Sequence, residues 1–233
     1  MSAIFARIKW LYAVIIIFIG MTLMIVTFYL LPKPYAVKFS AWFIRLLLFS
    51  PVRVKGKIDP DTQIFLVNHQ SDIDIGVMET ITSCDLAWVA KKELFDVPFF
   101  GLVVRLPKDI ALERESKTAL IKLLKDCKER LDEGRAITIF PEGTRSETGK
   151  MKPFKAGAKM VADKYSLKVQ PVVLIATASY FSNKRRDFRP GAITALFLDP
   201  FIAEKSDPDW LKNTQITMQK VYDDELANHP RYR

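Results

Sequence analysis

The pattern of apolar and polar positions begins with a long uncharged run over residues 10–31. Wound as one helix, this run is long enough to cross the ~30 Å hydrocarbon core of a bilayer. Trp10, Tyr12 and Tyr29 lie near its ends, where aromatic side chains favour the membrane–water interface. The run is longer than the apolar core of a cleavable signal peptide and is not followed by a small-residue cleavage site. The pattern therefore predicts a membrane-anchoring helix.

A second, mostly apolar stretch follows over residues 35–50, after a Pro-Lys-Pro break. Lys38 and Arg45 are seven positions apart, which places them on nearly the same face of a helix. Such a helix is typical of the membrane interface, and residues 1–52 together form the predicted membrane anchor. The sequence leaves two geometries open: the first helix crosses the bilayer, or the two helices form a hairpin within one leaflet.

Residues 53–233 show a different pattern, in which short apolar runs alternate with amphipathic helical segments. The runs typical of buried strands are 64–67, 86–90, 110–112, 137–140, 169–175 and 192–198. The helical segments cover about 117–133, 157–165 and 208–226. This alternation predicts an α/β fold with a mixed, largely parallel sheet flanked by helices, to which the N-terminal anchoring helices are attached.

The charge distribution supports the membrane interpretation. Residues 1–57 carry eight Lys/Arg and no Asp or Glu, and they account for nearly all of the formal net charge of +9. Basic side chains beside an apolar stretch are attracted to anionic lipid headgroups. The rest of the chain is nearly neutral, which argues against a nucleic-acid binder.

The few cysteines and histidines limit the chemistry that the chain can support. Cys84 and Cys127 form no C-x-x-C motif, so we expect free thiols in a reducing compartment. The two histidines, His69 and His229, cannot complete a zinc cluster with them, and we expect neither a metal nor a bound cofactor.

Polar residues follow the predicted strand 64–67 directly. A histidine can remove a proton from an alcohol near neutral pH, and a carboxylate that fixes its tautomer makes it a better base. His69 and Asp74 can meet only if the histidine lies on the turn before a helix and Asp74 reaches back from its first turn. Ser71 and Asp74 also match a capping box, so helix capping is the alternative interpretation of this segment.

A second polar loop follows the predicted strand 137–140. Gly143 permits a tight turn with exposed backbone N–H groups, and Thr144 adds a hydroxyl donor. Arg145 adds a charged fork suited to a phosphate. Because binding sites of open α/β sheets form at the carboxyl ends of strands, the two loops are expected to contribute to one site.

Together these loops carry a recognisable pattern. Asn68–Asp74 is a complete N-H-x-x-x-x-D motif, and Phe140–Ser146 is a complete F-P-E-G-T-R-S motif. The sequence resembles the 1-acylglycerol-3-phosphate acyltransferase family over about residues 50–205. An apolar run ending at Arg114 resembles a further motif of the family, although the usual leading glycine is missing.

The resemblance implies transfer of a fatty acyl group from acyl-CoA or acyl carrier protein to the free sn-2 hydroxyl of 1-acyl-glycerol 3-phosphate (lysophosphatidic acid). The product would be phosphatidic acid, made in phospholipid biosynthesis. The resemblance implies that His69 is the base and that Asp74 orients it, without a covalent acyl-enzyme. It also implies a set of residues that bind the glycerol-phosphate part of the acceptor: Glu142, Gly143, Thr144, Arg145 and Arg114.

Location and partners follow from the same resemblance. Since the acyl donors are cytosolic, residues 53–233 are expected to form a catalytic domain on the cytosolic face of the cytoplasmic (inner) membrane. The basic segment around Lys184–Arg186 and Arg189 either contacts donor phosphates or lipid, or is a solvated loop. Alternative acceptors are another lysophospholipid or glycerol 3-phosphate. An alternative of another class is a non-catalytic membrane lipid-binding protein.

Overall fold

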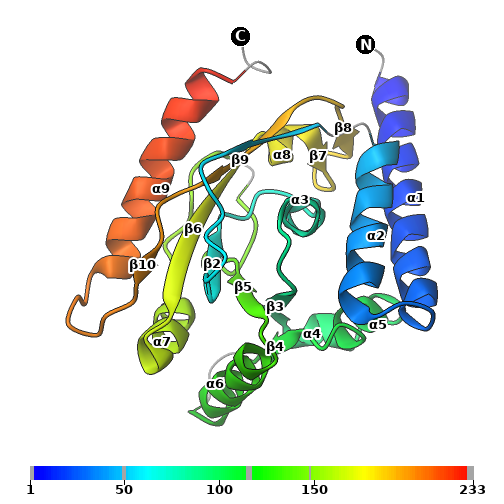
Figure 1. Ribbon diagram of the computed structural model, residues 1–233. Coiled ribbons are helices and arrows are strands. Elements are labelled where there is room, and N and C mark those ends of the chain that lie inside the picture. Colours follow the sequence, from blue (N-terminus) through cyan, green and yellow to red (C-terminus); the bar gives the residue numbers. More distant parts are fainter. Residues whose placement is uncertain (1–2, 49–50, 114–116, 147, 230–233) are drawn as a thin grey trace.

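The computed structural model describes residues 3–48, 51–113, 117–146 and 148–229. Figure 1 shows a twisted sheet with helices on both faces and a pair of long helices along one side. The pair consists of α1 (Ala3–Phe28) and α2 (Lys33–Leu47). The predicted fold class, an α/β domain preceded by an apolar helical segment, is confirmed.

The apolar runs form strands as predicted, with small shifts at their ends: β2 (Ile64–Val67), β3 (Leu86–Lys91), β4 (Ile110–Leu112), β5 (Ala136–Ile139), β6 (Lys168–Ile175) and β9 (Ile193–Phe197). The strand order is β1-β9-β6-β2-β5-β3-β4, and the pairs along it are parallel except β6 with β9. The pattern did not predict the short strands β1 (Val52–Lys55), β7 (Phe181–Ser182), β8 (Asp187–Phe188) and β10 (Phe201–Ile202).

Helices cover both faces of the sheet. One face is covered by the helices that the sequence predicted: α6 (Lys117–Asp132), α7 (Ala156–Tyr165) and α9 (Trp210–Ala227). The other face packs against α3 (Asp74–Ile81) and the α1–α2 pair. Because both faces are buried, β2 is a continuous apolar run rather than an alternating one. Helix α3 begins at Asp74, where the sequence analysis required a helix for the His69–Asp74 contact. The pattern did not predict the short helices α4 (Lys92–Phe95), α5 (Phe100–Arg105) and α8 (Thr177–Tyr180).

The first helix differs from its predicted bounds. It begins at Ala3 and ends at Phe28, whereas the uncharged run covers residues 10–31. Charged side chains near its start do not interrupt it, because they extend to the exposed surface. Residues 29–31 form a turn, and Pro34 lies in the first turn of α2, where a missing N–H has no intrahelical partner to lose.

Helices α1 and α2 approach each other closely at Gly20. A Cβ at this position would lie 2.2 Å from Cγ1 of Ile44, so a larger residue would require the Ile44 side chain to move. The Ser40 hydroxyl donates to the Gly20 carbonyl (2.5 Å), and the Tyr12 hydroxyl donates to the Leu47 carbonyl (2.9 Å). These contacts hold the two helices as an antiparallel hairpin, called the anchor hairpin below.

The anchor hairpin packs along the sheet domain. Tyr12 contacts Phe188 of β8 with ring centroids 6.5 Å apart, and Phe18 stacks on Phe99, just before α5, at 4.7 Å. By length and composition alone, α1 is a candidate membrane span. The contacts at Tyr12 and Phe18 show that the helix lies against the domain over these turns and does not project from it.

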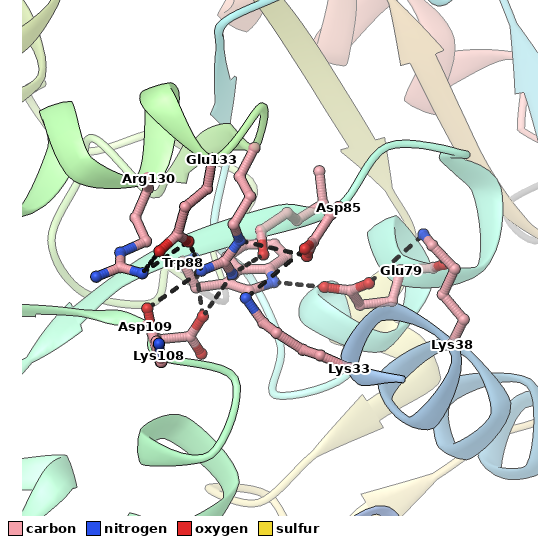
Figure 2. Close-up of polar contacts among 11 residues, drawn as sticks. Lys33, Lys38, Glu79, Asp85, Trp88, Lys108, Asp109, Arg130 and Glu133 are labelled. Carbon is pink, nitrogen blue, oxygen red and sulfur yellow. Dashed lines mark hydrogen bonds and ion pairs between the residues drawn. The ribbon is translucent and has the colours of Figure 1, made fainter. Parts of the chain in front are cut away.

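A buried ionic cluster ties α2 to the amino ends of three neighbouring strands. Arg135 precedes β5 and forms ion pairs with Asp85, before β3 (3.3 Å), and with Asp109, before β4 (3.7 Å). Lys33 of α2 reaches the same Asp85 at 3.6 Å, as Figure 2 shows. Burial raises the pKa of Asp109 to about 8. The cluster lies at the edge of the sheet opposite the polar loops that follow β2 and β5.

Candidate active site

The two polar loops meet at the carboxyl edge of the sheet. His69 follows β2 and Glu142 follows β5, and these strands are parallel neighbours. The Ser146 N–H donates to the His69 carbonyl (2.8 Å), so the loops are also joined directly. The sequence-based expectation that both loops contribute to one site agrees with this geometry.

His69 and Asp74 are in contact, with Nδ1 of His69 2.9 Å from Oδ2 of Asp74. Asp74 is the first residue of α3, and its fully buried Oδ2 also accepts from the backbone N–H groups of Gln70 (2.7 Å) and Ser71 (2.8 Å). An ionised carboxylate can only accept, so the imidazole proton lies on Nδ1 and Nε2 is left as the basic nitrogen. The same carboxylate therefore orients the histidine and holds the turn that precedes α3. The capping-box interpretation is wrong, because the Ser71 hydroxyl donates to the Phe181 carbonyl (2.6 Å) and no side-chain bond caps the start of α3.

Glu142 connects the two loops from below the surface. The residue is 1% exposed, and its two oxygens accept from the backbone N–H groups of His69 and Lys152, each at 2.8 Å. Burial raises the pKa of Glu142, and the two backbone bonds oppose that shift. These contacts position the His69 backbone; the contact between Glu142 and substrate that the resemblance implies stays a prediction.

Aromatic rings surround the other side of the histidine. The imidazole of His69 stacks on Phe140 with centroids 3.8 Å apart and planes 12° from parallel. Phe140 in turn stacks on Trp88 of β3 at 5.2 Å and 29°. Phe140 appears in the sequence only as the first letter of a motif, and Trp88 only as an apolar strand residue. The sequence carried no signal that either ring contacts His69.

Arg145 lies on the exposed side of the second loop and forms an ion pair with Asp72. Asp72 also accepts from the Asn183 side chain (2.7 Å), which in turn accepts from the Trp10 indole N–H of α1 (3.2 Å). Hydrogen bonds therefore run from the anchor hairpin to Arg145. Of the other predicted phosphate ligands, Gly143 has a left-handed φ of 66° and Thr144 is exposed. Arg114 lies outside the described residues.

Two cavities open beside these loops. A polar cavity of about 350 Å³, called the basic cavity below, is lined by residues that include Gln70, Arg185, Arg189 and Tyr222. The Gln70 side chain is buried, and its Oε1 has no hydrogen-bond partner among the described residues. A smaller apolar cavity of about 70 Å³ lies between the anchor hairpin and α3 and reaches Asp72.

Neither cysteine is an activated thiol, and the described residues contain no cluster that could bind a metal ion. Cys127 is a free, buried thiol whose pKa is raised by burial to about 12, and burial also raises the pKa of the free thiol Cys84. Within residues 3–48, 51–113, 117–146 and 148–229, no group of three His, Cys, Asp or Glu side chains could hold a metal ion.

Comparison with known proteins identifies the family. The model of the family described as Acyltransferase matches residues 51–175, a range that includes both polar loops. This chain belongs to the acyltransferase family. It is 39% identical over 168 residues to the 1-acyl-sn-glycerol-3-phosphate acyltransferase of Helicobacter pylori, which covers 72% of this chain and 71% of that protein. The enzyme of the same name from Cocos nucifera is 27% identical over 207 residues, covering 84% of this chain and 67% of that protein.

A solved structure supports the fold of this acyltransferase over nearly its whole length. The crystal structure of the 1-acyl-sn-glycerophosphate (LPA) acyltransferase PlsC from Thermotoga maritima has a TM-score of 0.79 and 24% identity. It covers 96% of this chain and 97% of that one, so the likeness includes the anchor hairpin. The family resemblance is confirmed, and the chain is an O-acyltransferase.

Proposed function

We propose that this acyltransferase transfers a fatty acyl group from acyl-CoA or acyl carrier protein to the sn-2 hydroxyl of 1-acyl-glycerol 3-phosphate, giving phosphatidic acid. The observation that carries the proposal is the His69–Asp74 contact at the carboxyl edge of the sheet, with Nε2 of His69 left as a base. The activity named for the relatives from Helicobacter pylori and Cocos nucifera supports lysophosphatidic acid as the acceptor.

In the proposed reaction, Nε2 of His69 takes the proton of the sn-2 hydroxyl while the hydroxyl oxygen attacks the thioester carbonyl carbon. Asp74 stabilises the imidazolium that forms. The carbon–sulfur bond then breaks, and the leaving thiolate receives the proton from His69. The acyl group passes directly between the substrates, which fits the raised pKa values of the thiols of Cys84 and Cys127.

We propose Arg145 as a ligand of the acceptor phosphate. Because charged hydrogen bonds contribute about 1.5–3 kcal/mol, Arg145→Ala is expected to raise the KM for lysophosphatidic acid about 10- to 100-fold. The KM for the acyl donor should change little. Steady-state assays at fixed donor concentration measure the effect, and Arg53→Ala, on the exposed strand β1, is the matched control. An unchanged KM for the lipid would remove Arg145 from this role.

We propose that the basic cavity accepts the phosphate-bearing arm of the acyl donor. Arg185 and Arg189 line the cavity together with one acid, Asp187, which pairs with Arg189 (2.7 Å), so the lining keeps a net positive charge. Gln70, the residue after His69, supplies a buried polar atom without a partner among the described residues. Both CoA and acyl carrier protein present a phosphopantetheine arm, so this chemistry serves either donor.

We propose that the anchor hairpin lies in the cytoplasmic leaflet of the inner membrane, with the catalytic domain in the cytosol. The apolar side chains exposed on the hairpin include Ile8, Leu11, Ile15, Phe39, Trp42 and Leu46. Between the two geometries open from sequence, the packing of α1 against β8 and α5 favours a hairpin in one leaflet. In this position a lipid acceptor reaches the site without passing through water.

The deciding experiment is thiol release from acyl-CoA by the purified protein in detergent, with lysophosphatidic acid as acceptor. Acceptor-dependent release with phosphatidic acid as product is expected. Release that depends instead on another lysophospholipid or on glycerol 3-phosphate would change the acceptor. If neither acyl-CoA nor acylated carrier protein releases thiol with any of these acceptors, the proposed reaction is wrong and the non-catalytic lipid-binding alternative is favoured.

A further inference from the structure

The contact with Asp74 fixes one atom of the His69 imidazole but not the plane of the ring. A base must aim Nε2 at the acceptor hydroxyl, and the ring can still rotate about the bond from Nδ1 to Asp74. The plane is instead set by Phe140, which lies 3.8 Å from the imidazole and within 12° of parallel. The orientation of His69 therefore depends on what holds Phe140.

Phe140 carries no polar group, and Trp88 supports it from the neighbouring strand. The two rings are 5.2 Å apart with planes 29° from parallel. The Trp88 side chain is fixed by a directed bond, because its indole N–H donates to Oε1 of Glu79 at 2.8 Å in a buried environment. A stacked pair alone tolerates sliding and tilting, whereas a hydrogen bond at the ring edge defines the rotation of the indole.

Glu79 is a buried carboxylate on α3 and is held in turn by the anchor hairpin. Nζ of Lys38, on α2, lies 3.8 Å from Oε2 of Glu79 and donates to the carbonyls of Thr82 (2.8 Å) and Glu79 (3.4 Å). The ammonium thus also satisfies carbonyls at the carboxyl end of α3, where a positive charge is favourable. Figure 2 shows Lys38, Glu79 and Trp88 in line.

These contacts connect both ends of α3 to the His69 side chain. The helix begins at Asp74, which holds Nδ1 of His69, and its last turns carry Glu79, which fixes the ring plane through Trp88 and Phe140. Both constraints on the imidazole therefore come from one short helix. A shift of α3 along or about its axis would disturb both of them together.

We infer that Trp88 is a positioning residue for His69. The orientation of Trp88 is set by Glu79 on α3 and, through Glu79, by Lys38 on the anchor hairpin. The inference rests on the proposed role of His69 as the base. Helix α2 then helps to orient the base, in addition to the role in membrane attachment proposed above.

The test compares conservative variants in pairs. Trp88→Phe keeps an aromatic ring and removes the indole N–H; Trp210→Phe removes an equivalent bond to Asp163 (2.8 Å) from another buried tryptophan. Lys38→Met removes the ammonium next to Glu79, whereas Lys33→Met removes a different ion pair on the same helix. Melting temperature is measured for every variant.

We expect Trp88→Phe and Lys38→Met to lower kcat about tenfold while both KM values stay within about twofold, because small misplacement of a base is costly. Trp210→Phe and Lys33→Met should retain wild-type kcat. An unchanged kcat in Trp88→Phe would overturn the inference. Equal losses in the two tryptophan variants would also overturn it, since loss of packing would then explain both.

A second readout does not depend on turnover. The chain has two histidines, so ¹⁵N-histidine labelling isolates the imidazole signals. In Trp88→Phe the His69 ring protons are expected to shift as the stack on Phe140 loosens, and the His229 signals should not move. If the wild-type protein fails to acylate lysophosphatidic acid, the proposed function fails, and the His69 shift still decides whether Trp88 positions the ring.

Discussion

Replacing His69 with alanine is expected to lower kcat about 10²- to 10⁴-fold, because general-base catalysis typically contributes a factor of this size. The protein should remain folded, since the bonds from the His69 backbone to Glu142 and Ser146 do not involve the side chain. Lipid binding should also persist, because the phosphate contacts proposed here lie on the other loop. Thiol release from acyl-CoA at saturating lysophosphatidic acid measures the loss.

The second histidine provides the matched control. His229 is buried just after α9 and belongs to neither polar loop, so His229→Ala should keep kcat near the wild-type value. A His69→Ala variant with more than about a tenth of wild-type kcat would exclude His69 as the general base. It would leave binding of the two substrates side by side as the main source of rate enhancement.

Asp74→Asn is expected to lower kcat about 10²- to 10³-fold while KM values change little. The amide must still accept from the backbone N–H groups of Gln70 and Ser71, so its oxygen takes the place of Oδ2. The imidazole then keeps its tautomer but loses the negative charge that stabilises the imidazolium. If the amide nitrogen turns toward His69 instead, the tautomer is wrong and the loss is larger.

Steady-state kinetics and a melting curve separate these effects from a loss of fold. Asp163→Asn is the control, because Asp163 also accepts from a buried partner, the Trp210 indole, but lies far from the site. Retention of wild-type kcat in Asp74→Asn would show that Asp74 acts only to hold the turn before α3, through the N–H groups of Gln70 and Ser71.

Helices and strands whose own apolar and polar residues show which side is buried were predictable from the sequence. Strand β2 has the predicted bounds, because four consecutive apolar residues between polar ones fit a strand buried on both faces. Helix α6 was predicted from its apolar stripe, and it ends just before Gly134, which has a left-handed φ of 75°. The short elements α4, α5, β7 and β8 were missed because runs of two to six residues carry no usable period.

In the candidate site, contacts between residues close in sequence were predictable and contacts between distant residues were not. His69 and Asp74 are five residues apart, so their contact could be predicted from local geometry: the histidine had to lie on the turn before a helix and Asp74 in its first turn. The structure has this arrangement. The partners of His69 that lie far along the chain could not be found in this way. Trp88 and Phe140 are brought together by the pairing of β3 with β5, and that register appears only once the sheet is formed.

The ion pair between Asp72 and Arg145 has a consequence for turnover. The Arg145 guanidinium is already paired with the Asp72 carboxylate, so a phosphate that bound Arg145 in the proposed role would exchange one anion for another. The net gain in affinity is therefore smaller than an unengaged guanidinium would provide. Phosphatidic acid, the proposed product, carries the same phosphate and would leave by the reverse exchange, in which Asp72 competes for Arg145. In a membrane where the product accumulates, this competition would limit occupancy of the site by finished lipid.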